Sequence, residues 1–351
     1  MCEVILSAME ADAKDRRLEV LDTLAELVTA AGPVPQVLVY GPGSDEMAEE
    51  LGVRLGGLGH LPRRRRLAGP DGRRSALATA ARCWPAQPGW DIVVQVRDSS
   101  DPEVPANPAA GHPRTRDAGN PVPGNRPPDV VVDVRDPARP VIRHVSPELP
   151  MSDAARIREA QAFFGARAAG WDAKFGDDLP AYAAAVRAAG YRPGDVVADI
   201  GCGTGRALPY LREAVGPAGG VLGVELTLEM LAEVRAAGRG AGVGLLLGDA
   251  LRLPLPDGVL GGAFAAGLVN HLPDPVAGLA EIARATRRGG RLALFHPTGR
   301  VALAARHGRT VGPDEPLSEG RLTRNLAAAG WRLDVYDDAA ERFLAVAVRA
   351  A

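Results

Sequence analysis

Apolar and polar residues in the first 150 positions follow two patterns in turn. Between residues 8 and 31, leucines recur at helical spacing and Gly32-Pro33 ends the pattern, which predicts a helix. The acidic segment 44–51 predicts a second helix. Four short apolar runs predict buried strands, at residues 36–40, 91–96, 129–134 and 141–145. Helices and strands in this order indicate an α/β domain.

From residue 151 onward the two patterns alternate more regularly. Residues 151–190 predict helices that end near Gly190. Further helices are predicted at residues 207–215, 227–238, 275–287 and 317–329. Strands are predicted at residues 196–200, 219–225, 243–250, 262–268, 291–296, 331–338 and 342–350. The last two strands are expected to form an antiparallel pair. This part of the chain is therefore a second α/β domain.

Residues 101–128 contain a proline every few positions, with glycine and asparagine between them. Such a composition does not build packed structure, so we expect a long flexible loop or linker. We divide the chain into an N-terminal α/β domain of residues 1–150, which contains this loop, and a second domain of residues 151–351. The run Arg63–Arg66 is expected to be either a solvated loop tip or an anion site.

Length, charge and cysteine content narrow the class of protein. The 351 residues suffice for two domains, and a net charge of −2 gives no overall field toward nucleic acid or an anionic membrane. Cys2, Cys83 and Cys202 have no metal-ligand spacing and cannot all pair, so we expect a reduced, cytoplasmic protein without a metal. Acidic residues throughout 1–31 argue against a signal peptide, and no apolar run has the length of a membrane span.

The segment V-V-A-D-I-G-C-G-T-G at residues 196–205 has the pattern of a buried strand followed by a glycine-rich turn and a helix. In this geometry backbone N–H groups face a ligand, and glycines leave no side chain in between. A dinucleotide-binding turn would need glycine in place of Arg206. A P-loop would need a lysine in the turn, and the only lysines are Lys14 and Lys174. A tight turn without a ligand is the remaining alternative.

With the motif D-I-G-C-G-T-G, the chain from about Phe163 to its C-terminus resembles the class I S-adenosylmethionine-dependent methyltransferases. It is most similar to the broad group that includes enzymes of ubiquinone and menaquinone biosynthesis. The resemblance implies S-adenosylmethionine as cofactor and a Rossmann-like, seven-stranded, mostly parallel sheet with helices on both faces, next to the smaller N-terminal α/β domain. Phe163, Phe164 and Trp171 are expected to cover the cofactor or to pack in the core. The chain departs from the family at Leu260-Gly261, where Phe-Asp is frequent.

The resemblance also assigns cofactor contacts to the ends of successive strands. Glu225 lies about twenty residues beyond the glycine turn, where a carboxylate accepts hydrogen bonds from both ribose hydroxyls. Asp249 corresponds to the family's acceptor for the adenine amino group, while Ala266 and Gly267 correspond to backbone near the methionine part. The predicted cofactor-binding residues are Asp199, Gly201, Gly203, Gly205, Glu225, Leu226, Asp249, Ala250, Ala266 and Gly267.

Methyl transfer from a sulfonium is an in-line displacement, and holding the reactants in line supplies roughly 7–11 kcal/mol in favourable cases. A hydroxyl acceptor also benefits from a general base, a role suited to histidine. His271 is our first candidate and His296 the second, with Asn270 nearby, because these residues follow strands at the same sheet edge. A structural hydrogen bond is the alternative role of either histidine. An enolate, amine or thiol acceptor can react without either histidine.

These features predict a methyltransferase that moves a methyl group to a small-molecule acceptor of specialised metabolism, with oxygen as the first acceptor atom and carbon or nitrogen as alternatives. Two other functions stay open: a nucleotide-dependent oxidoreductase, which Arg206 disfavours, and a non-catalytic cofactor-binding regulator. A nucleic-acid substrate is disfavoured, because no Asn-Pro-Pro-aromatic sequence follows the fourth strand. The first domain resembles uridine kinases through V-L-V-Y-G-P-G, without their phosphate-binding lysine. We expect it to be a partner surface, a substrate lid or a homodimerisation module.

Overall fold

A computed structural model gives the fold of the chain. It describes residues 2–30, 36–40, 44–57, 63–67, 74–78, 92–97, 129–134, 140–145, 149, 151–175, 177–306, 310–312 and 315–350. The described residues up to Phe163 form one compact unit, and those from Phe164 onward form a second. The predicted boundary lies at residue 150, and the proline-rich segment 101–128 falls outside the described residues. Among the described helices, none is long and apolar enough to cross a membrane.

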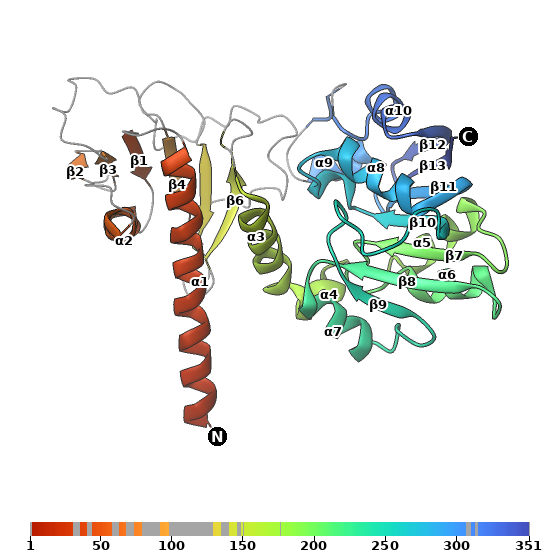
Figure 1. The fold of residues 1–351 in the computed structure, drawn as a ribbon, viewed down its shortest axis with the longest axis horizontal. Coiled ribbons are helices and arrows are strands. Elements are labelled where there is room, and N and C mark those ends of the chain that lie inside the picture. Colours follow the sequence, from red (N-terminus) through yellow and green to blue (C-terminus); the bar gives the residue numbers. More distant parts are fainter. Residues whose placement is uncertain are drawn as a thin grey trace. The chain divides into compact units, whose positions relative to one another are not determined.

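The first unit is a six-stranded α/β fold (Figure 1). Its elements are α1 (Cys2–Ala30), β1 (Gln36–Tyr40), α2 (Ser44–Gly57), β2 (Arg63–Leu67), β3 (Arg74–Ala78), β4 (Ile92–Arg97), β5 (Val130–Asp133), β6 (Val141–Val145) and most of α3 (Asp153–Gly165). The strand order is β2-β3-β1-β4-β5-β6, with β1, β4 and β5 parallel. The four predicted strands are confirmed. The expectation that Arg63–Arg66 forms a loop tip was wrong, because these residues pair with β3 as a strand, while the anion site stays a prediction.

The helical spacing of leucines in α1 explains the core of the first unit. Leu24 and Leu27 are buried together with Leu51 of α2 and with valines of the parallel strands. A buried ion pair adds to this core, since Arg16 of α1 lies 2.6 Å from the Glu159 carboxylate of α3. Removing either partner would leave an uncompensated buried charge, so the pair holds α3 against α1.

The second unit contains a seven-stranded sheet in the order β12-β13-β11-β10-β7-β8-β9 (Figure 1). Its strands are β7 (Val196–Ile200), β8 (Gly220–Glu225), β9 (Gly244–Leu247), β10 (Leu260–Ala266), β11 (Thr286–His296), β12 (Trp331–Ala339) and β13 (Arg342–Arg349). Its helices are η1 (Ala168–Gly170), α4 (Trp171–Phe175), α5 (Leu179–Ala189), α6 (Leu208–Val215), α7 (Leu228–Ala236), η2 (Val269–His271), α8 (Pro275–Ala285), α9 (Arg300–Arg306) and α10 (Glu319–Ala328). The five strands from β11 to β9 run parallel, and β13 is antiparallel to both β11 and β12. The predicted Rossmann-like fold is confirmed.

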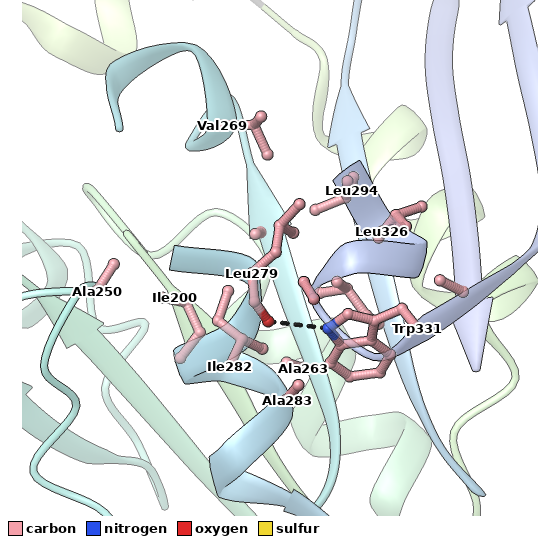
Figure 2. Packing of buried hydrophobic residues seen from close by; sticks show 14 of the residues in the cluster. Ile200, Ala250, Ala263, Val269, Leu279, Ile282, Ala283, Leu294, Leu326 and Trp331 are labelled. Atoms are coloured by element: carbon pink, nitrogen blue, oxygen red, sulfur yellow. Dashed lines mark hydrogen bonds between the residues drawn. The ribbon is translucent and has the colours of Figure 1, made fainter. Parts of the chain in front are cut away.

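Residues that alternate along the strands build two cores, one on each face of this sheet. Ala263 and Ala265 of β10 pack with α8 and α10, whereas Phe264 between them packs with α5 and α6. In the first of these cores the Trp331 indole donates a hydrogen bond of 2.9 Å to the Leu279 carbonyl oxygen (Figure 2). Because both faces are covered, the central strands are apolar throughout, as parallel strands require.

Three predicted boundaries in this unit were wrong. The third strand ends at Leu247 and not at residue 250, so Asp249 lies beyond it. The fourth strand spans Leu260–Ala266 rather than 262–268, because Gly267 takes a positive φ of 71° and ends it. Helix α8 ends at Ala285, since Thr286 already has an extended backbone and β11 begins there. The arginines and glycines at 287–290 therefore belong to a strand and not to a helix end. Helix α9 was not predicted.

Candidate functional site

Two of the three glycines in the turn between β7 and α6 have different surroundings. Gly203 has a φ of 53°, and a Cβ atom built on it meets nothing within 4 Å. Gly205 has a φ of 78°, but a Cβ there would lie 2.8 Å from Leu208 and 3.0 Å from Val234. Gly203 thus borders open space, whereas Gly205 lets α6 and α7 pack closely against the turn.

Glu225, at the end of β8, is fixed against this turn by hydrogen bonds. One carboxylate oxygen accepts the Gly203 N–H at 2.9 Å, and the other accepts the Thr227 N–H at 3.0 Å. Burial raises the pKa of Glu225 above its ordinary value, although these backbone donors act in the opposite direction. Glu225 therefore lies against the glycine turn, and its contact with ribose hydroxyls stays a prediction.

Asp199, in β7, is the most perturbed carboxyl group of the site. Its side chain is 2% exposed, and its Oδ1 has no hydrogen-bond partner among the described residues. Burial, followed by the negative charge of Glu225, raises the pKa of Asp199 to about 8. A buried oxygen without a partner at the end of a parallel strand is a candidate contact for a polar ligand group.

The raised pKa of Asp199 predicts how the stability of the second unit depends on pH. Its folded value of about 8 exceeds the unfolded value of 3.8, so the folded state holds a proton that the unfolded state releases. Stability is then fully present below pH 3.8 and is lost as pH rises toward 8, by at most about 1.4 kcal/mol per pH unit. In Asp199→Asn the neutral amide should remove this loss. The melting temperature of the variant relative to the native protein should rise between pH 5 and pH 8, by thermal circular dichroism.

Glu341→Gln is the matched control, because this carboxyl is exposed at the β12–β13 turn. Its melting temperature relative to the native protein should not change with pH in the same way. An Asp199→Asn difference that is equal at pH 5 and pH 8 would show that Asp199 has an ordinary pKa.

Three other predicted residues lie beyond the ends of β8 and β9, which are neighbours in the sheet. Leu226 follows Glu225, and Asp249 and Ala250 follow β9. Asp249 Oδ1 accepts the Leu251 N–H at 3.0 Å, which orients the carboxylate within its own turn. Because parallel neighbours end at one edge, these residues lie at the same sheet edge as the glycine turn.

A pocket lies beyond the ends of β10 and β11, at the same edge of the sheet. It is small and partly open to solvent. The described residues that line it are Ala265, Gly267, Leu268, Val269, Asn270, Leu294, Phe295, His296, Thr298, Arg300, Leu303, Leu317 and Phe343. Of the residues predicted from sequence, it brings together Gly267, Asn270 and His296. Ala266 lies next to it in β10.

His271 does not line this pocket. Its side chain is exposed, and its ring packs edge-on against Phe164 with 5.2 Å between the ring centroids. Phe164 also contacts Trp171 at 5.7 Å. The two predicted aromatic residues of the second unit thus form a cluster with His271, while Phe163 belongs to the first unit.

His296 is held in the pocket wall by Thr298. Its Nδ1 lies 2.8 Å from the Thr298 carbonyl oxygen and 3.1 Å from the Thr298 amide nitrogen. Both contacts involve Nδ1, and in the tautomer in which Nδ1–H donates to the Thr298 carbonyl oxygen the lone pair lies on Nε2. Histidine oriented in this way through one nitrogen is suited to proton transfer through the other.

An ion cluster connects helix α4 to the glycine turn. The sequence did not predict it. Asp172 of α4 accepts hydrogen bonds from Thr204 Oγ1 at 2.6 Å, Arg206 Nη1 at 3.1 Å and Arg239 Nη1 at 2.6 Å. Arg206 also pairs with Asp178, just before α5. Burial raises the pKa of Asp172, but the Thr204 and Arg239 hydrogen bonds outweigh it, so the pKa of this carboxyl is lowered. Helix α4 is thus fastened to the turn.

Residues 198–294 match the family model described as a methyltransferase domain. Two curated proteins are similar over part of the chain. An uncharacterized 37.1 kDa protein in transposon TN4556 of Streptomyces fradiae is 39% identical over 107 residues, which is 30% of this chain and 31% of that protein. A demethylmenaquinone methyltransferase of Symbiobacterium thermophilum is 33% identical over 105 residues, 29% of this chain and 42% of that protein. The chain therefore spans less than half the length of these relatives.

Solved structures are similar to the second half of the chain. A SAM-dependent methyltransferase from Aquifex aeolicus is 25% identical, with a TM-score of 0.41 that covers 50% of this chain and 90% of that one. A geranyl diphosphate C-methyltransferase from Streptomyces coelicolor is 15% identical, with a TM-score of 0.40, over 49% and 79% of the two chains. In the described residues, no group of three or more His, Cys, Asp or Glu side chains could hold a metal ion. Residues 198–294 of the Rossmann-like unit therefore match a methyltransferase domain, and this match indicates S-adenosylmethionine as the cofactor.

Proposed function

We propose that the chain transfers a methyl group from S-adenosylmethionine to an oxygen atom of a small-molecule acceptor. The observation that supports this most directly is the pocket beyond β10 and β11, which contains His296 and adjoins the glycine turn along one sheet edge. The similarity to demethylmenaquinone methyltransferase supports the menaquinone-like group over the matched part of the chain. The resemblance of residues 1–150 to uridine kinases has no support in the comparisons, and no role is built on it.

The hydrogen-bond acceptors around the glycine turn fit the cofactor. A side chain at Gly203 would fill the open space beside the turn, as expected where a ligand lies against backbone. The Glu225 carboxylate uses one lone pair on each oxygen for backbone N–H groups and keeps acceptor capacity for ribose hydroxyls. The unpartnered Asp199 oxygen offers an acceptor for the ammonium group of the methionine part. Asp249, beyond β9, suits the adenine amino group.

In this proposal His296 is the general base. When bound, S-adenosylmethionine supplies an electrophilic methyl group on a sulfonium. Nε2 of His296 accepts the proton of the acceptor hydroxyl as the oxygen attacks that methyl group. Nδ1–H then donates to the Thr298 carbonyl oxygen, 2.8 Å away, which stabilises the resulting imidazolium. Because His271 lies outside the pocket lining, the order of the two histidine candidates is reversed from the sequence prediction.

The cofactor and the transfer are tested by two measurements on the full chain. Isothermal titration with S-adenosylmethionine and S-adenosylhomocysteine should give micromolar binding, while the control nucleotides NAD and UTP should give none. Incubation of radiolabelled S-adenosylmethionine with a library of hydroxylated small molecules should then give labelled ether products. Binding of NAD without binding of the sulfur cofactors would favour the oxidoreductase alternative. Cofactor binding without transfer to any acceptor would favour the non-catalytic regulator.

A further inference from the structure

We propose that the pocket beyond β10 and β11 selects an uncharged, apolar acceptor and excludes carboxylates and phosphates. This inference rests on the proposed function, because it takes this pocket as the acceptor site. It goes further by naming the charge and polarity of the acceptor. Three observations support it: the apolar lining, the pairing of the cation in the wall, and the position of His296.

Most of the described lining is apolar. Side chains from four different elements or loops, among them Leu268, Leu303, Leu317 and Phe343, contribute to it. Such a wall gains free energy when it covers apolar surface and loses it when it strips water from an ion. The polar groups of the described lining are confined to Asn270, His296, Thr298 and Arg300. An acceptor therefore needs a hydrocarbon or aromatic body with a small polar group that reaches His296.

Arg300 could attract an anion, but two carboxylates already hold it. Its Nε lies 3.0 Å from Asp338 Oδ2, and its backbone N–H donates to Asp338 Oδ1 at 2.8 Å. Its Nη1 lies 3.5 Å from Glu315 Oε2. The three side chains are 12–16% exposed, so solvent screens these charges little. Two carboxylates against one guanidinium leave no net positive charge in this part of the wall to attract an anionic acceptor.

A second arginine nearby does not reverse this balance. Arg306, at the end of α9, donates to Thr298 Oγ1 at 3.3 Å, and its side chain is exposed. With Arg300, Asp338 and Glu315, the described charged groups at this side of the pocket sum to zero. A phosphate or carboxylate would meet no uncompensated buried cation among them, and bidentate recognition by Arg300 would first require breaking its contacts to Asp338.

The test uses four probes that share one naphthalene ring: naphthol, naphthoate, naphthyl phosphate and naphthylmethylammonium. Dissociation constants are measured by titration of the full chain at neutral pH, with and without saturating S-adenosylhomocysteine. Naphthol should bind at least about tenfold more tightly than each charged probe, since only the charged probes lose ionic hydration. In Asp338→Asn, which loosens Arg300, naphthoate affinity should rise at least about fivefold, while naphthol affinity changes less than about twofold. Arg300→Met removes the guanidinium itself, so this variant should not bind naphthoate more tightly than the native chain does.

Arg332→Met is the matched control, because it removes an arginine of β12 whose side chain is 67% exposed. It should leave all four affinities unchanged. Tighter binding of naphthoate, naphthyl phosphate or the ammonium probe than of naphthol to the native chain would overturn the inference, and so would the absence of naphthol binding. The proposed function is tested separately by S-adenosylhomocysteine titration. If the cofactor binds and a charged probe binds more tightly than naphthol, the acceptor class is wrong and the proposed function stands. If the cofactor does not bind, the probe affinities measured without it still decide the selectivity of the pocket.

Discussion

Replacing Gly203 by alanine should weaken S-adenosylhomocysteine binding by roughly 10- to 200-fold and leave the fold largely intact. The added Cβ meets no protein atom within 4 Å, so it occupies the open space where the cofactor backbone contact is proposed. A methyl group forced into such a contact costs about 1–3 kcal/mol. The positive φ of 53° adds about 1–2 kcal/mol of backbone strain, which lowers the melting temperature by only a few degrees. Isothermal titration and thermal circular dichroism measure the two effects.

Gly205→Ala is the comparison that separates ligand contact from packing. Its Cβ would lie 2.8 Å from Leu208 and 3.0 Å from Val234, both of which are buried. Overpacking adds to the backbone strain, so the melting temperature should fall at least about twice as far as in Gly203→Ala. If Gly203→Ala binds the cofactor as tightly as the native chain, the turn does not contact the cofactor at Gly203.

Replacing His296 by glutamine should lower kcat for a hydroxyl acceptor by about 10²- to 10⁴-fold, the usual contribution of a general base. S-adenosylhomocysteine should still bind within a few-fold of its native affinity, because His296 lies at the ends of β10 and β11 and not at the glycine turn. The pH–rate profile should lose the limb in which the rate rises as a neutral histidine forms. Single-turnover rates with an identified acceptor, recorded between pH 5 and pH 9, give both readouts.

His271→Gln decides between the two histidines. His271 packs on Phe164 outside the pocket lining, so this variant should keep most of the turnover and the full pH profile. The reverse result, with turnover lost in His271→Gln and kept in His296→Gln, would restore the order predicted from the sequence. Equal turnover in both variants would mean that the acceptor needs no histidine base.

The sequence was sufficient to predict the central strands and the glycine turn of the second unit, because each of them is specified by neighbouring residues. The mostly apolar run Val196–Ile200, followed by glycines, predicts a buried strand and a turn. Glu225 and Asp249 follow later strands, and parallel strands end at one edge, so their proximity to the turn needed no coordinates. The strand at Arg63–Leu67 escaped prediction because it depends on pairing with β3, and an arginine run has no apolar period.

The details of the site depend on contacts between distant residues. Asp172 meets Arg206 and Arg239 only in the folded chain, and no spacing in the sequence indicates an ion cluster across such separations. The choice between His271 and His296 likewise depends on side-chain direction after each strand. Both follow neighbouring strands, but one packs on an aromatic ring and the other lines a pocket.

The ion cluster on the glycine turn limits how far the second unit can be trimmed. The family model begins to match at residue 198, so an expression fragment designed from this match would start shortly before β7. Such a fragment would delete Asp172 and Asp178 and leave the guanidinium of Arg206, now 6% exposed, without either carboxylate. The turn would lose the ion pairs of Arg206 and, with Tyr182 of α5, the ring that packs on this guanidinium. A minimal fragment for crystallisation or assay must therefore begin before Trp171.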